Sequence, residues 1–107
     1  MVYFVYTMRA IEGQAEALQK LAKTMTKAAQ KYVPEDLVSF EKVSNITGDR
    51  TQIHLVSKAR SLSAWESAFE KTQKDKAFAA AMKKYTEEVK TPGWVASGQF
   101  YRVDEVD

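Results

Sequence analysis

The spacing of hydrophobic residues along the chain alternates between the two-residue period of a strand and the longer period of a helix. Residues 2–9 are rich in β-branched and aromatic side chains without a helical period, which predicts a strand. Residues 14–32 repeat apolar groups three and four positions apart, which predicts an amphipathic helix that ends before Pro34. Residues 37–44 and 51–59 follow strand patterns, and the short connection between them predicts an antiparallel hairpin.

The second half of the chain predicts more helix and then a last strand. The spacing of Ser and Glu within residues 63–66 is that of a capping box, which predicts a helix start there. Residues 73–75 interrupt the pattern, and a new apolar stripe runs from Phe78 to Val89. We therefore expect two short helices with a break, one bent helix being the alternative. Residues 94–103 return to strand composition.

The order strand, helix, strand, strand, helix pair, strand is that of a ferredoxin-like α+β sandwich. Right-handed crossovers place the helices on the same face of a four-stranded antiparallel sheet. No linker or internal repeat divides the chain. The sequence therefore predicts a single βαββαβ domain over residues 1–107.

The other face of such a sheet is left uncovered by helices, and in a monomer it should be polar. Phe4 and Tyr6 share one face of the first strand. Tyr3 and Val5 share its opposite face, and the last strand is likewise apolar on both faces. Large exposed apolar patches usually mark an interface. We expect two sheets to pack face to face in a twofold homodimer, the alternative being a monomer in which these side chains are shielded locally.

Composition narrows the classes of function. The chain has no cysteine, which excludes disulfides, thiol catalysis and thiolate metal sites. A net charge of +2 is too small to indicate nucleic-acid binding, and residues 51–59 offer no aromatic platform for RNA. No apolar run approaches the ~20 residues of a membrane span, and residues 1–6 resemble a strand rather than a signal peptide. We expect a cytoplasmic protein that does not associate with nucleic acid or membrane.

His54 is the only histidine and the candidate catalytic residue. Histidine exchanges protons near neutral pH, so it suits general acid or base catalysis. On a strand whose other face carries Ile53 and Leu55, it should point into the space between two sheets or toward solvent. The alternative is a hydrogen-bonded structural histidine at the dimer interface. A single histidine without a visible carboxylate cluster does not build a metal site, so no metal is expected.

Aromatic and sulfur-containing side chains suggest a candidate ligand site. They lie on the predicted inner faces of the helices and the first strand, where they would line a pocket together with Phe4. Such a pocket suits a flat apolar or quinone-like molecule with one polar handle. The alternative is an ordinary filled core, which aromatic stripes at helical spacing usually form. The candidate ligand-binding residues are Tyr6, Trp65, Phe69, Met82 and Tyr85.

Three stretches carry a family resemblance: MRAIEGQAEALQKLAKTM, IHLVSKA and SLSAWESAFEKTQKDKAFAAAMKKY. Together they resemble the dimeric α+β-barrel superfamily. The nearest branches are similar to antibiotic-biosynthesis monooxygenases, with NIPSNAP-like and stress-responsive barrels close by. The resemblance covers nearly the whole chain and implies the fold and the dimer. Members include cofactor-free oxygenases, haem-degrading enzymes, isomerases and proteins of no known activity.

Haem is not expected, because the residues of the haem-degrading branch are missing. Where that branch carries an axial histidine, this chain has Met82 or its neighbour Lys83. Ser57 replaces a tryptophan of the third strand, and the asparagine of the first strand falls near Thr7. Met82 also completes the apolar stripe of its helix, so we interpret it as core packing. No cofactor is predicted.

Two functions remain open on the sequence. The first is a cofactor-independent monooxygenase-like or isomerase-like enzyme acting on a small aromatic compound. In it His54 would transfer a proton, and Trp65 and Tyr6 would hold the substrate. The second is a non-catalytic dimeric module that binds a small molecule or only assembles. A cavity faced by a polar side chain favours the first, and a filled interior favours the second.

Overall fold

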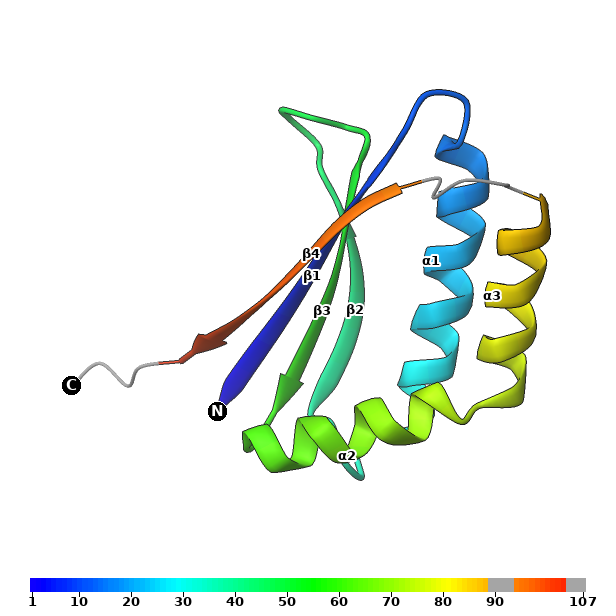
Figure 1. The fold of residues 1–107 in the computed structure, drawn as a ribbon. Coiled ribbons are helices and arrows are strands. Elements are labelled where there is room, and N and C mark those ends of the chain that lie inside the picture. The colour runs from blue at the N-terminus through cyan, green and yellow to red at the C-terminus, as the bar shows by residue number, and fades with distance from the viewer. Residues whose placement is uncertain (89–93, 104–107) are drawn as a thin grey trace.

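The computed structural model describes residues 1–88 and 94–103. Its element order confirms the predicted one, with the second helical region broken in two. Figure 1 shows the helices on one side of the sheet, with α1 and α3 side by side and α2 running across its end. The elements are β1 (Val2–Ala10), α1 (Ala15–Gln30), β2 (Ser39–Ser44), β3 (Gln52–Ala59), α2 (Leu62–Gln73), α3 (Lys76–Glu88) and β4 (Trp94–Arg102).

The strands form one four-stranded antiparallel sheet in the order β2-β3-β1-β4. This order confirms the ferredoxin-like α+β fold: β2 and β3 pair as a hairpin, and helical crossovers join β1 to β2 and β3 to β4. No helix in the described ranges is long and apolar enough to cross a bilayer.

Two-residue alternation separates the two faces of the sheet, as the sequence predicted. On β3, Ile53 and Leu55 are buried beneath the helices, whereas His54 and Val56 are only partly covered on the opposite face. Residues paired across the strands point to the same face of the sheet. Tyr6 of β1 pairs with Leu55 of β3 and Gly98 of β4, so these three positions face the helices. We call the side turned away from the helices the open face.

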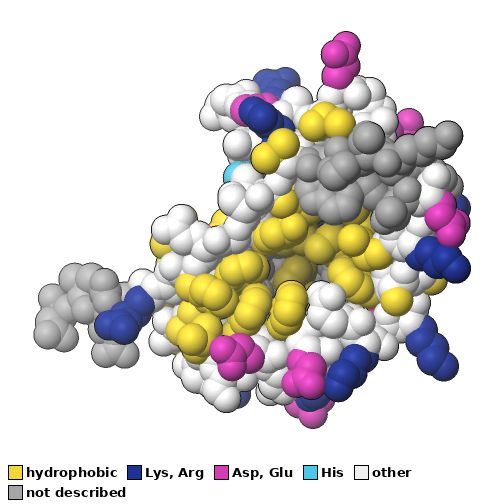
Figure 2. Space-filling view, in the orientation of Figure 1, with side chains coloured by type: hydrophobic (Ala, Val, Ile, Leu, Met, Phe, Trp, Pro, Cys, Tyr) yellow, Lys and Arg dark blue, Asp and Glu magenta, His cyan; other side chains and the backbone are white. Residues whose placement is uncertain are grey.

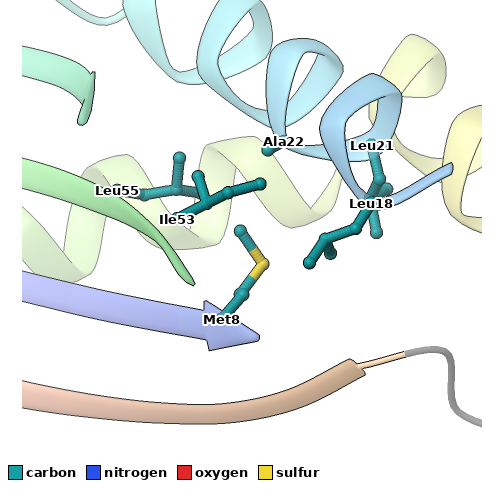
Figure 3. Close-up of a cluster of buried hydrophobic side chains, with 6 residues drawn as sticks. All are labelled: Met8, Leu18, Leu21, Ala22, Ile53 and Leu55. Atoms are coloured by element: carbon teal, nitrogen blue, oxygen red, sulfur yellow. The ribbon is translucent and has the colours of Figure 1, made fainter. Parts of the chain in front are cut away.

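The main core joins α1 to the centre of the sheet. The residues recur at i, i+3 and i+4 on α1, so one helical stripe meets the helix-facing side of β1 and β3. Met82 of α3 packs against the edge of this cluster, which agrees with its interpretation as a core residue. Figure 3 shows the cluster, which consists of Met8, Leu18, Leu21, Ala22, Ile53 and Leu55.

The start of α2 differs from the predicted capping box. Ser61, not Ser63, is the N-cap: its backbone is extended (φ −151°, ψ 163°) and its hydroxyl accepts the Ala64 N–H at 3.1 Å. The fully buried Ala59 ends β3, so the chain must turn directly after it. Ser61 is therefore the residue that leaves the strand, and Ser63 already lies in the first turn of the helix.

Asp75 explains the break between α2 and α3. Its carboxylate accepts the Phe78 N–H at 3.0 Å, which caps α3. It also accepts a hydrogen bond from Lys31 at the end of α1, with 2.7 Å between Nζ and Oδ2. The Lys31 ammonium and then the α3 backbone lower the pKa of Asp75 from its ordinary value. One side chain thus ties α1 to the α2–α3 junction.

Replacing Asp75 with Asn is expected to lower the melting temperature by a few degrees at neutral pH. Asn still caps the helix but loses the ion pair with Lys31. Because the pKa of Asp75 is depressed in the folded state, the ionised group stabilises the fold above the ordinary carboxyl range. That contribution disappears as the pH falls through the depressed value, so the two melting curves should converge in acid. Thermal unfolding followed by circular dichroism across this range measures the difference.

Glu70→Gln is the matched control for Asp75→Asn. It removes an exposed i,i+4 pair with Lys74, whose Nζ lies 3.1 Å from the carboxylate. Exposed pairs contribute little, so this variant should melt like the wild type. Equal shifts in the two variants, or a difference that persists in acid, would contradict the role given to Asp75.

Candidate functional site

An apolar cavity of about 90 Å³ lies between the helix-facing side of the sheet and the helices. Figure 2 shows hydrophobic side chains gathered around a hollow on this side of the molecule. The sheet and the segment before β2 contribute Phe4, Tyr6, Leu37, Phe40, Leu55 and Ser57, and the helices contribute Met25, Ala29, Trp65, Ala68, Phe69, Thr72, Gln73 and Phe78. Apolar cavities of ~150 Å³ stay dry and bind benzene. This smaller cavity, open on one side, suits a single ring or a group of similar width.

Four aromatic rings from three elements cluster at the cavity: Phe4, Trp65 and Phe69 belong to its wall, and Phe100 packs against the cluster. The Trp65 ring of α2 lies 4.6 Å from Phe4 of β1 and 5.1 Å from Phe69 one helical turn further on. Phe100 of β4 meets Trp65 edge to face at 4.8 Å. Phe69 and Phe100 remain 50% and 43% exposed, so this aromatic cluster reaches solvent. Tilted and edge-on contacts of this kind favour a further aromatic ring.

Gly98 allows the Phe4 ring to lie across β4. A Cβ atom at Gly98 would come within 2.7 Å of Phe4 Cζ, closer than any ordinary contact. The Phe4 ring cannot shift freely, because Trp65 and Phe100 each hold it at 4.6 Å. The missing side chain of Gly98 therefore helps to define the shape of the cavity.

Ser57 is the buried polar group of the cavity wall. Its side chain is 1% exposed, and its Oγ accepts the Trp65 Nε1–H at 2.9 Å. This hydrogen bond links β3 to α2 and holds the indole in the cavity wall. Ser57 follows Ile53 and Leu55 in phase, so alternation alone placed a serine at a buried position. Ser57 was not proposed as a site residue from the sequence. A polar residue at a position that the alternation predicts to be buried is the signal that could have identified it.

The structure brings together three of the five predicted ligand-binding residues. Tyr6, Trp65 and Phe69 all line the cavity. Met82 packs against the main core and is not part of the cavity wall. The side chain of Tyr85 lies outside the part of the chain that the structure describes. Phe100, which sequence analysis did not select, joins the group because the register of β4 places it opposite Phe4.

His54 lies on the open face, on the opposite side of the sheet from the cavity. The Asn45 amide donates to the Asp49 carbonyl at 2.7 Å, so its Oδ1 faces His54 and accepts from Nε2 at 2.8 Å. The second ring nitrogen, Nδ1, lies 2.9 Å from the Thr7 hydroxyl. In the neutral ring Nε2 therefore carries the proton, and Nδ1 accepts from Thr7. Both nitrogens are occupied, as expected of a histidine that ties the hairpin turn to β1.

The cavity wall is almost free of titratable groups. Tyr6 is the only one among the described lining residues. No group of three His, Asp or Glu side chains that would suit a metal ion occurs in residues 1–88 and 94–103. Outside the wall, an ion pair joins α2 to the segment before β2: Lys71 Nζ lies 2.7 Å from Asp36 Oδ2, and this hydrogen bond raises the pKa of Lys71. The cavity therefore favours neutral molecules.

A second and wider hollow, of about 470 Å³, lies between the start of α1 and α3. Its walls include the charged side chains of Glu16, Lys20 and Lys84. A groove with such walls is well solvated, and it lacks the aromatic enclosure of the cavity beneath α2. The smaller apolar cavity is thus the better candidate site.

Comparison with solved structures shows the fold. A candidate antibiotic biosynthesis monooxygenase from Deinococcus radiodurans matches with a TM-score of 0.70 at 12% identity, covering 100% of this chain and 96% of that one. An uncharacterised NIPSNAP domain protein from Burkholderia xenovorans matches with a TM-score of 0.71 at 11% identity, covering 97% and 95%. The chain has the fold of these proteins. A candidate antibiotic biosynthesis monooxygenase from Nitrosomonas europaea matches similarly, with a TM-score of 0.70 at 8% identity over 96% and 98%.

These matches confirm, at the level of fold, the resemblance found in the sequence. Identities of 8 to 12% carry no information on activity, because one fold hosts many functions. No protein-family model and no curated protein sequence matches the chain. The residues of the cavity are therefore the basis for a proposed function.

Proposed function

We propose that this protein binds a small, neutral, flat compound, with one aromatic ring or a group of similar width, in the cavity between sheet and helices. The observation that carries the proposal is the cavity of about 90 Å³ whose wall includes the rings of Phe4, Trp65 and Phe69, with Phe100 packed against the first two. Stacking on these rings and removal of the ligand's apolar surface from water would supply the binding energy. The single titratable side chain of the described wall suits binding better than proton transfer.

The homodimer belongs to the same proposal. On the open face, Val5 lies opposite Val56, and Tyr3 lies opposite Tyr101. Tyr101 is 47% exposed in the single chain, and Val95, on the same face near the other end of β4, is 54% exposed. These apolar groups lie on the central strands and β4, interspersed with polar residues such as Ser97 and Gln99, and they support contact between two open faces. The cavity lies on the other side of each sheet, so both would remain accessible in the dimer.

A second candidate is a cofactor-independent monooxygenase-like or isomerase-like enzyme using the same cavity. It is favoured by the shared fold with candidate antibiotic biosynthesis monooxygenases. His54 is poorly placed for that role, because its ring nitrogens are hydrogen-bonded on the opposite face. Proton transfer inside the cavity would fall to the Tyr6 hydroxyl instead. Conversion of a bound compound to product, detected by mass spectrometry, would favour this candidate over simple binding.

Gly98→Ala tests the binding site. The new methyl group would meet the Phe4 ring at 2.7 Å and drive it into the cavity. Toluene should bind the wild type, and the variant should bind it at least about tenfold more weakly, because lost cavity volume removes apolar contact. Ligand-detected saturation-transfer NMR and titration of amide shifts measure both affinities.

Ser97→Ala is the control for Gly98→Ala. Ser97 neighbours Gly98 on β4 but lies on the open face, opposite Thr7. Its substitution should leave the toluene affinity within about twofold of the wild type. Failure of toluene to bind the folded wild type, or equal binding to wild type and Gly98→Ala, would contradict the proposed site.

A further inference from the structure

Ser57 is a polar side chain placed in an otherwise apolar wall. It projects from β3 toward the helices, in phase with Leu55 and Ala59, and is 1% exposed. It is one of the residues that line the cavity. A buried hydroxyl without good partners costs free energy, so each of its hydrogen bonds has to be accounted for.

The Ser57 hydroxyl proton has only a poor hydrogen-bond acceptor. A hydroxyl has one donor and two acceptor positions, and an indole N–H can only donate. Trp65 therefore occupies an acceptor position of Ser57, at 2.9 Å. The O–H is directed to the Phe4 carbonyl at 3.5 Å, well beyond the ~2.7–2.8 Å of a normal O–H···O bond. The indole fixes the oxygen in place, and the hydrogen has no well-placed acceptor within the described part of the chain.

From this geometry we infer that the ligand carries a neutral hydrogen-bond acceptor, of the ketone or aldehyde class, which takes the Ser57 O–H. The inference rests on the proposed function and specifies the chemistry of its ligand. A ligand that offered only a donor would leave the Ser57 proton without a good acceptor. A carboxylate would enter without a counter-charge, because no described lining residue is a lysine, arginine or histidine. A carbonyl on an apolar ring meets both conditions.

Thr72 shows that not every hydroxyl in the wall is available. It lies on α2 and lines the cavity, but its O–H donates to the Ala68 carbonyl at 2.8 Å within the helix. Its hydrogen-bonding capacity as a donor is therefore already used. Ser57 and Thr72 form a matched pair of cavity hydroxyls, one with a poorly placed acceptor and one with a good acceptor.

The test compares acetophenone with α-methylstyrene, in which a CH₂ group replaces the carbonyl oxygen at nearly the same shape. Dissociation constants for both are measured by NMR titration on the wild type, Ser57→Ala and Thr72→Val. In Ser57→Ala the preference for the ketone over the alkene should fall by about three- to tenfold relative to the wild type. In Thr72→Val the two affinities should move together and their ratio should stay the same. The ratio cancels any general effect of a substitution on the cavity.

The outcomes separate this inference from the proposed function. If both probes bind the wild type and Ser57→Ala leaves their ratio unchanged, the role of Ser57 is overturned while the binding site stands. If neither probe binds the folded wild type, both are overturned. Should Ser57→Ala fail to fold, the carbonyl ¹³C resonance of bound acetophenone in the wild type decides. A downfield shift relative to the ketone in hydrocarbon solvent supports the hydrogen bond, and an unshifted resonance refutes it.

Discussion

Val5→Asp is expected to convert the homodimer into a monomer. Val5 occupies the middle of the open face, where the register sets it beside Val56 and Gln99. In a face-to-face dimer each new carboxylate would be withdrawn from water without a partner, next to its symmetry mate. The dissociation constant should rise at least about a hundredfold. Light scattering at micromolar concentration should give a mass near the 12.1 kDa of one chain, against twice that value for the wild type.

Ile46→Asp is the matched control for the dimer. It makes the same chemical change in the hairpin turn, at a side chain that is 82% exposed and away from the centre of the open face. This variant should remain dimeric. A wild type that behaves as a monomer, or a Val5→Asp variant that still dimerises, would refute the proposed interface. Because the cavity lies on the other side of the sheet, folded monomeric Val5→Asp should still bind toluene.

Leu18→Ala is expected to produce the largest loss of stability. Leu18 is fully buried and packs in the core cluster between α1 and the sheet, together with Met8 and Ile53. Truncation removes buried methyl groups and leaves a void, which should lower the free energy of unfolding by about 3 kcal/mol. For a domain of this size the melting temperature should fall by about 12–20 °C. Urea unfolding followed by circular dichroism, at one fixed protein concentration, measures the change.

Gln19→Ala is the control for the same helix. Gln19 is the next residue along α1 and is exposed, so its truncation removes little packing, and alanine favours helix. Its stability should stay within about 0.5 kcal/mol of the wild type. A similar loss in both variants would show that α1 is sensitive to any substitution, and would contradict the role given to the buried stripe.

The two faces of the sheet have different roles in the proposed function. The cavity side holds the rings of Phe4 and Trp65 and the Ser57 hydroxyl. The open face holds His54, with both ring nitrogens hydrogen-bonded, and the apolar side chains that would form the dimer. The proposed ligand binding and the proposed assembly would thus use opposite faces of one sheet, and substitutions such as Gly98→Ala and Val5→Asp should affect them independently.

The sequence by itself determined the order of the elements, the faces of the strands and the buried stripe of α1. These features are local, because each side chain's direction follows from the period of its own backbone. Phe4 and Tyr6 were therefore placed correctly on the helix-facing side, and His54 on the other side of β3. The break after Gln73 was also legible, since it interrupts a periodic pattern.

Only the tertiary structure decided where the candidate site lies and what it contains. The cavity exists because α2 crosses the end of the sheet and brings Trp65 against Phe4, from residues far apart in the sequence. The absence of a Cβ at Gly98 and the single good hydrogen bond of Ser57 matter only once β1, β3 and β4 are paired. Such contacts depend on crossing angles and on which strands become neighbours, and no local period encodes them.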